Sequence, residues 1–132
     1  MEEKMTKETL IQTKEYFIAY SILINAAQHH GFATYQEIAQ AIGLPTAGNY
    51  LGKKIGEILG TISANEKEQG RPMLSAIAIG TNGKTGAGFI PWAKQLGYLK
   101  EGEDEEAFWH KECEKVYEEW KITYRISKTI KE

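Results

Sequence analysis

Residues 34–52 read TYQEIAQAIGLPTAGNYLG, and this stretch predicts a short helix, a tight turn and the start of a second helix. Thr34 and Glu37 have the spacing of a capping box, in which each side chain accepts a hydrogen bond from the other residue's backbone amide. Gly43 follows the last turn, where a positive φ is usual, and Pro45 prevents simple continuation of the helix. Two short helices joined so closely cross steeply, and many DNA-binding domains present the second helix to a groove. The alternative is a helical hairpin within an all-α core.

The second helix of this motif is predicted to run to about residue 64, with an apolar stripe toward the core and Asn49 and Lys53 on the opposite side. Glycines recur at every fourth position of this helix, at residues 48, 52, 56 and 60. Each glycine inside a helix lowers stability by about 1 kcal/mol relative to alanine. We expect Gly56 and Gly60 to face away from the core, where a DNA groove, a partner's backbone or a second subunit comes close. The alternative is a helix that kinks or ends early, with Gly60 as its C-cap.

Longer helices are predicted on both sides of the motif. The segment of residues 6–29 has helical periodicity and an apolar middle, YFIAYSILINAA, which predicts burial in the core or a contact with a second subunit. Residues 104–126 carry apolar and aromatic side chains at helical spacing and predict a long amphipathic helix. Pro91 suits the first position of a short helix, PWAKQLGYL, that ends near Gly97.

Residues 72–80, PMLSAIAIG, alternate in the manner of a strand, and Asn82-Gly83 is a strong signal for a hairpin turn. A return strand through residues 87–90 would complete a two-stranded wing. The expected fold class is therefore α+β, mostly α: a winged helix-turn-helix with a two-stranded hairpin and long N- and C-terminal helices. Residues 1–132 are expected to form a single domain, since this length suits one core.

Composition and charge narrow the classes of function. The chain has 132 residues, 42% hydrophobic and 26% charged, with one cysteine, no signal-like leader and no apolar run long enough to span a membrane. These features predict a cytoplasmic protein with no membrane partner. Seven Lys and Arg against four Glu give residues 34–100 a net charge of +3, whereas nine acidic residues against two Lys give residues 101–119 a net charge of −7. The basic part coincides with the helix-turn-helix.

The motif resembles the helix-turn-helix of the alkylguanine-DNA alkyltransferases and the alkyltransferase-like proteins. That pattern runs Ser/Thr-Tyr-x-x-Ile/Leu-Ala, then a Gly, a Pro and Ala-Ala-Arg-x-Val-Gly, and the matching residues here are Tyr35, Ile38, Ala39, Gly43, Pro45, Ala47, Leu51 and Gly52. The resemblance implies a DNA-binding scaffold, with Tyr35 in the place of a tyrosine that helps rotate a nucleotide out of the duplex. Asn49 stands in the place of the arginine that fills the vacated space, and its side chain is too short to do so in the same way.

The catalytic motif of that family is missing. Where the family has Pro-Cys-His-Arg, this chain has Pro72-Met73-Leu74-Ser75, with neither a thiol nor an imidazole to accept an alkyl group. Gly83-Lys84-Thr85 lacks the other residues of a phosphate loop. His110 and Cys113 are the one plausible pair of metal ligands, and one pair does not make a site. The sequence therefore predicts no enzyme activity, no metal and no cofactor.

Two classes of function remain. The first is a non-catalytic regulator or accessory factor that binds double-stranded DNA, and the expected contact residues are Tyr35, Asn49, Lys53, Lys54, Arg71 and Lys84. Among these residues, Arg71 and Lys84 would reach phosphates through the wing. The second is a protein-interaction or dimerisation module on the same fold with no nucleic-acid role. A homodimer would use the apolar first helix, the exposed glycines and the tryptophans at positions 92, 109 and 120.

Overall fold

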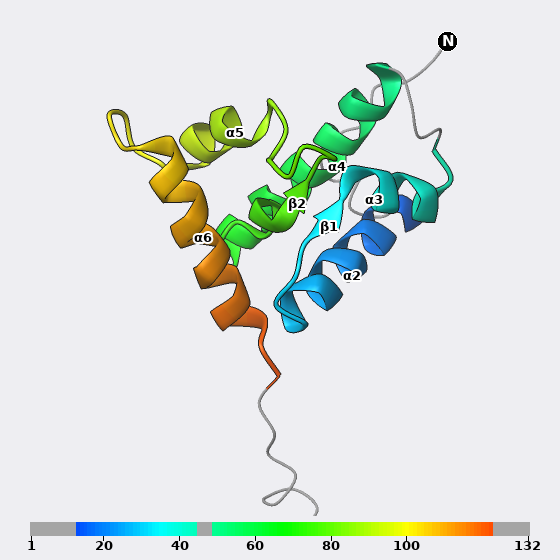
Figure 1. Cartoon of the computed structure of the whole chain (residues 1–132), viewed down its shortest axis with the longest axis horizontal. Coiled ribbons are helices and arrows are strands. Elements are labelled where there is room, and N and C mark those ends of the chain that lie inside the picture. The colour runs from blue at the N-terminus through cyan, green and yellow to red at the C-terminus, as the bar shows by residue number, and fades with distance from the viewer. Residues whose placement is uncertain (1–12, 45–48, 123–132) are drawn as a thin grey trace, which may run out of the picture.

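The computed structural model describes residues 13–44 and 49–122 (Figure 1). The chain is mostly helical and has one small parallel sheet of two strands in the described part, which places it in the α+β class. The elements follow in the order α2 (Lys14–Gln28), β1 (Ala33–Thr34), α3 (Tyr35–Ile42), α4 (Asn49–Glu68), the 3-10 helix η1 (Leu74–Ile77), β2 (Ala78–Ile79), α5 (Phe89–Leu96) and α6 (Glu105–Trp120).

The start and end of α3 agree with the sequence pattern. Thr34 Oγ1 accepts a hydrogen bond from the Glu37 amide at 3.0 Å, and Glu37 Oε1 accepts one from the Thr34 amide at 2.7 Å, so the capping box is formed. Gly43 ends the helix with a φ of +83°. The predicted turn at Pro45 lies outside the described residues. The short helix α5 begins at Phe89, two residues before the predicted start at Pro91, and Gly97 caps its C-terminal end as expected. Helix α4 continues four residues beyond the predicted end, to Glu68.

The predicted hairpin wing is wrong. Strand β2 pairs in parallel with β1, with Ala33 opposite Ala78 and Thr34 opposite Ile79, and the residues before β2 form the 3-10 helix η1. A turn does follow β2, because the Gly80 amide donates to the Lys84 carbonyl at 2.8 Å. Of the positions expected for a return strand, residues 87 and 88 form a turn, and the buried Phe89 begins α5.

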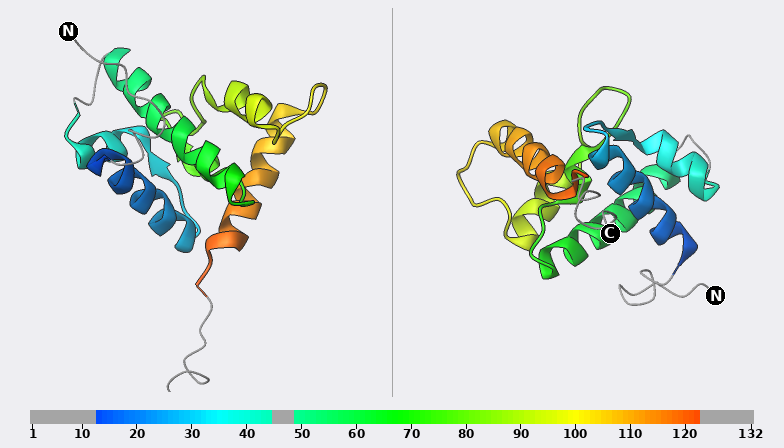
Figure 2. Two further views of the ribbon diagram at one scale, coloured as in Figure 1. Left: turned by 180° about the vertical axis from the view of Figure 1, so that it is seen from behind. Right: turned by 90° about the horizontal axis from the view of Figure 1, so that it is seen from below.

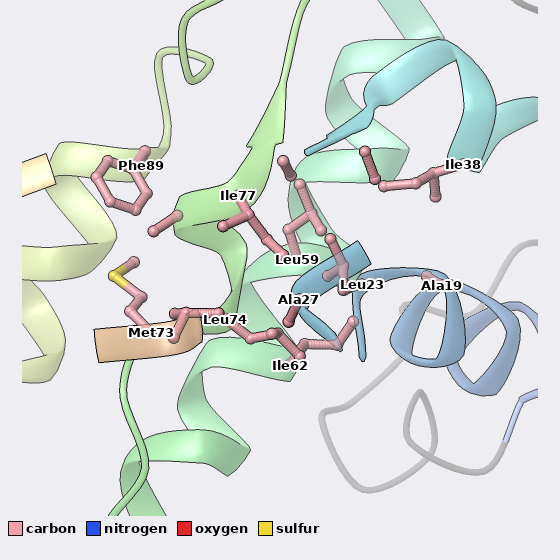
Figure 3. Packing of buried hydrophobic residues seen from close by; sticks show 14 of the residues in the cluster. Ala19, Leu23, Ala27, Ile38, Leu59, Ile62, Met73, Leu74, Ile77 and Phe89 are labelled. Carbon is pink, nitrogen blue, oxygen red and sulfur yellow. The ribbon is translucent and has the colours of Figure 1, made fainter. Parts of the chain in front are cut away.

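The core lies around the middle and C-terminal half of α4 (Figure 3). Helices α2 and α3 pack on one side of α4, and α5 lies on the other (Figures 1 and 2). Leu23 from α2, Ile38 from α3, Ile62 from α4 and Ile77 from η1 are all completely buried. Much of the apolar stretch of the first predicted helix is therefore core, although Phe17 remains 59% exposed.

Helix α6 completes the core from the side away from α3. It packs on η1 and α2, and it ends at Trp120, six residues before the predicted end. Val116 and Cys113 on its inner face are buried, in agreement with its amphipathic pattern. Within the described residues, no helix has both the length and the apolar character needed to cross a membrane.

Candidate functional site

A cavity of about 260 Å³ opens between α4 and the segment of residues 80–88, which we call the glycine loop. Helix α4 contributes Gly52, Ile55 and Gly56 to the wall of the cavity, and the loop contributes residues 86–88. The aromatic side chains of Tyr35, Phe89 and Trp92 complete the lining together with Leu59, Gly60 and Ser75. The cavity therefore lies where the two helices of the predicted helix-turn-helix meet the segment that was expected to be a wing.

The glycines of α4 have different surroundings. A Cβ atom at Gly60 would lie 2.4 Å from Cε2 of Trp92, so the indole ring packs directly on the helix backbone. The expectation that Gly60 faces away from the core is therefore wrong, because α5 covers it, and α4 does not end there. A Cβ atom at Gly52 or Gly56 would meet nothing within 4 Å. Both of these residues line the cavity, and the space beside them is the cavity itself.

Tyr35 connects α3 to the glycine loop. Its hydroxyl oxygen accepts a hydrogen bond from the Gly86 amide, and a Cβ atom at Gly86 would lie 2.8 Å from that oxygen. Burial raises the pKa of Tyr35, and the Gly86 amide only partly opposes this effect, so the phenol stays protonated at neutral pH. Tyr35 is thus a wall of the cavity and a support for the loop.

Three lysines are close in sequence to residues that line the cavity, although none of them lines it. Lys53 follows Gly52 on α4 and is exposed, Lys54 is half-buried, and Lys84 is exposed in the glycine loop. None of the three makes an ion pair with a residue that the structure describes. The backbone of Asn49 begins α4, but its side chain lies outside the described part of the chain.

Arg71 does not belong to this group. It follows the C-terminal end of α4, about 22 Å along the helix from Lys53 at 1.5 Å per residue. Its guanidinium donates to the buried carboxylate of Glu66 at 2.7 and 2.9 Å, and it lies over the ring of Trp120. The hydrogen bonds to Glu66 raise the pKa of Arg71 further above its usual range. The structure thus places Lys53 and Lys84 next to cavity-lining segments in the sequence and ties the half-buried Arg71 to Glu66 at the other end of α4.

The sulfur-bearing side chains lie away from the cavity. Met73, at the position of the cysteine in the resembled family, is 1% exposed and does not line the cavity. Burial raises the pKa of Cys113 to about 12, and its thiol donates to the carbonyl of Ala76 at 3.5 Å. Among the residues that the structure describes, no group of three His, Cys, Asp or Glu side chains could hold a metal ion.

The acidic segment of residues 101–119 comprises the turn before α6 and most of α6, and both lie across the molecule from the N-terminal end of α4 (Figures 1 and 2). The start of α6 is nearer to the cavity, because Phe108 packs on the cavity-lining ring of Phe89 with their centroids 5.9 Å apart. Lys94 of α5 forms ion pairs with two residues of this segment, with its Nζ atom 3.4 Å from Glu101 and 3.8 Å from Glu105. The acidic helix therefore leaves Lys53 and Lys84 uncovered.

The sequence did not identify the loop side of the cavity. Ser75, Gly86, Phe89 and Trp92 all line it, and none of these residues was a predicted site residue. The glycine-rich run GTNGKTGAG before FIPW was a signal for a tightly packed loop, but it was interpreted as a hairpin turn. Comparisons of the chain with protein-family models, with curated proteins and with solved structures find no match.

Proposed function

We propose that this chain is a non-catalytic, cytoplasmic DNA-binding protein, a regulator or accessory factor, in which α3 and α4 act as a helix-turn-helix. The N-terminal half of α4 would enter a groove of the duplex, and the glycine loop would contact the backbone in the manner of a wing. The observation that carries this proposal is that two exposed lysines without an ion pair to a described residue adjoin the two sides of one cavity in sequence: Lys53 follows Gly52 of α4, and Lys84 precedes Gly86 of the glycine loop by two positions.

Charge supports this orientation of the duplex. Phosphate contacts by lysine supply most of the affinity of non-specific binding, at about 10⁻⁴ to 10⁻⁶ M under physiological salt. The acidic residues of α6 would repel DNA, and α6 lies across the molecule from the N-terminal end of α4. Glu57 is exposed one turn along α4 from Lys53, and it is the acidic residue of α4 closest in sequence to this lysine. It would weaken binding without preventing it.

The test is fluorescence polarisation with a short, labelled duplex of mixed sequence at several salt concentrations. We expect binding at about 50 mM salt that weakens steeply toward 200 mM. Lys53→Glu and Lys84→Glu should each weaken binding and reduce the slope of log K against log salt by about 1. The matched control is Lys111→Glu, the same charge change at an exposed position of α6, which should leave binding nearly unchanged.

Two outcomes would overturn the proposal. One is no binding at low salt by a folded protein. The other is an equal loss of affinity in all three lysine variants, which would show a dependence on net charge and not on this face. If the protein instead forms a stable dimer by light scattering and its variants bind no duplex, the interaction module is the better description. The exposed ring of Phe17 on α2 would then be the first position to change.

A further inference from the structure

We propose that the cavity between α4 and the glycine loop binds a small planar aromatic molecule that carries a hydrogen-bond acceptor. The DNA contacts proposed above come from Lys53 and Lys84, which do not line the cavity, so its interior has no assigned role. The site is defined by its volume, the flatness of one wall and the chemistry of two hydroxyl groups.

The volume suits one or two fused rings. At about 260 Å³, the cavity lies between the roughly 150 Å³ of an apolar cavity that holds benzene and the roughly 300 Å³ at which pockets begin to take drug-sized ligands. Ile55, Leu59 and Phe89 make the lining apolar. On α4, Gly52 and Gly56 leave bare backbone with no atom in the space where a Cβ would stand. A flat ring can therefore lie against the helix.

The polar groups of the lining are donors. Tyr35 Oη already accepts from the Gly86 amide, and its own proton has no acceptor among the described residues. Ser75 Oγ accepts a hydrogen bond from Ser63 Oγ at 2.8 Å. The hydroxyl proton of Ser75 is therefore also without an acceptor among the described residues. Two hydroxyl protons are thus available at an otherwise apolar cavity. A ligand with a ring nitrogen or carbonyl would accept one of them, whereas a ring without an acceptor would leave both unused.

Quinoline and naphthalene test this chemistry, because they have the same shape and only quinoline has an acceptor. Each is titrated into the full chain without DNA, and NMR follows the amide of Gly86 and the indole N–H of Trp92. We expect saturable shifts at both signals, with quinoline binding about 2- to 10-fold more tightly than naphthalene. The indole of Trp109 is the internal control, because it donates to the Ala76 carbonyl and does not line the cavity.

Gly56→Leu should abolish the shifts, because its side chain would fill the cavity from a position where the backbone has room. The matched control is Glu57→Leu, the same side chain one residue along on the exposed face, which should keep full affinity. Tyr35→Phe keeps the ring and removes one donor, so it should lower the ratio between the two ligands. Gly52→Leu repeats the test if Gly56→Leu proves unstable in a thermal melt.

The proposal is overturned if neither compound gives a saturable shift, if both bind equally, or if Gly56→Leu binds as well as the wild type. Bases of nucleic acids have the same ring chemistry, so a duplex with one unpaired base is added to the quinoline complex. If this duplex displaces quinoline and a fully paired duplex does not, the natural ligand of the cavity is a base of a nucleic acid. If neither duplex displaces quinoline, the natural ligand is a free small molecule.

Discussion

The half-buried Arg71 and the buried Glu66 form an ion pair at the C-terminal end of α4, with Nη2 of the arginine 2.7 Å from Oε2 of the glutamate. The Glu66 side chain is completely buried, and Tyr20 donates to the same oxygen. Arg71 therefore neutralises a charge inside the protein, and it is not free to meet phosphates. Removing the Arg71 side chain should therefore lower the free energy of unfolding.

Arg71→Ala is expected to lower the free energy of unfolding by about 3–5 kcal/mol, because it leaves the Glu66 carboxylate buried without a counter-charge. Chemical denaturation followed by circular dichroism measures this change. Lys121→Ala, which breaks an exposed pair with Glu118, is the matched control and should cost at most about 1 kcal/mol. A loss in Arg71→Ala as small as that of the control would contradict a structural role for the pair.

Gly56→Ala and Gly60→Ala should change stability in opposite directions. Alanine at position 56 has room and gains helix propensity, so it should stabilise by about 0.5–1 kcal/mol. At position 60 the added methyl group meets the ring of Trp92, and this overpacking should destabilise by about 1–3 kcal/mol. Thermal melts of the two variants decide the matter, and equal shifts would mean that Trp92 does not pack on Gly60.

Stability should fall at alkaline pH. Burial raises the pKa of Cys113 from 9.0 to about 12, and the pKa values of Tyr16 and Tyr117 from 10.0 to about 12. These groups are neutral in the fold and ionise more readily in the unfolded chain, so their contribution is complete below about pH 9 and is lost toward pH 12. Unfolding free energies measured from pH 7 to 11 would show the decline.

The thiol provides the control for this effect. Cys113→Ser removes the group that titrates first, so its curve should stay flatter than that of the wild type between pH 9 and 10. In the native protein the thiol should react slowly with Ellman's reagent at pH 8, because it is both buried and protonated. Rapid labelling of the folded protein would contradict the burial of Cys113.

Glu57→Gln should strengthen duplex binding about twofold at low salt, because it removes the repulsion between the Glu57 carboxylate and a DNA phosphate. Two unit charges about 10 Å apart in water interact by roughly 0.4 kcal/mol. The polarisation assay measures this difference, and Glu114→Gln on the exposed side of α6 is the control with the same charge change. If both variants bind equally more tightly, net charge and not the α4 surface determines affinity.

Local signals in the sequence predicted local structure well. Thr34, Glu37 and Gly43 fixed both ends of α3, because capping depends on residues within one turn. The alternation in residues 73–79 was misleading, because residues 73–78 are all buried and no polar face exists to alternate with. Whether such a run is a strand or a 3-10 helix depends on its neighbours in space.

The candidate site depended on contacts that are distant in sequence, and these could not be predicted. Gly60 is covered by Trp92, Tyr35 holds Gly86, and neither pair has a pattern that spacing reveals. Arg71 was expected at a wing, but its partner Glu66 is buried by the packing around it. Lys53 was predicted to be exposed, and it is, because helical periodicity alone determines which face of α4 it occupies.

The parallel register of β1 and β2 bears on how the protein acquires this cavity. Thr34 caps α3 and also lies opposite Ile79, the last residue before the glycine loop. A parallel pair needs a crossover, and here the intervening chain includes α3 and α4, so the two strands are far apart in sequence. We expect their pairing to be slow in folding, because the chain must close this long loop before the strands meet.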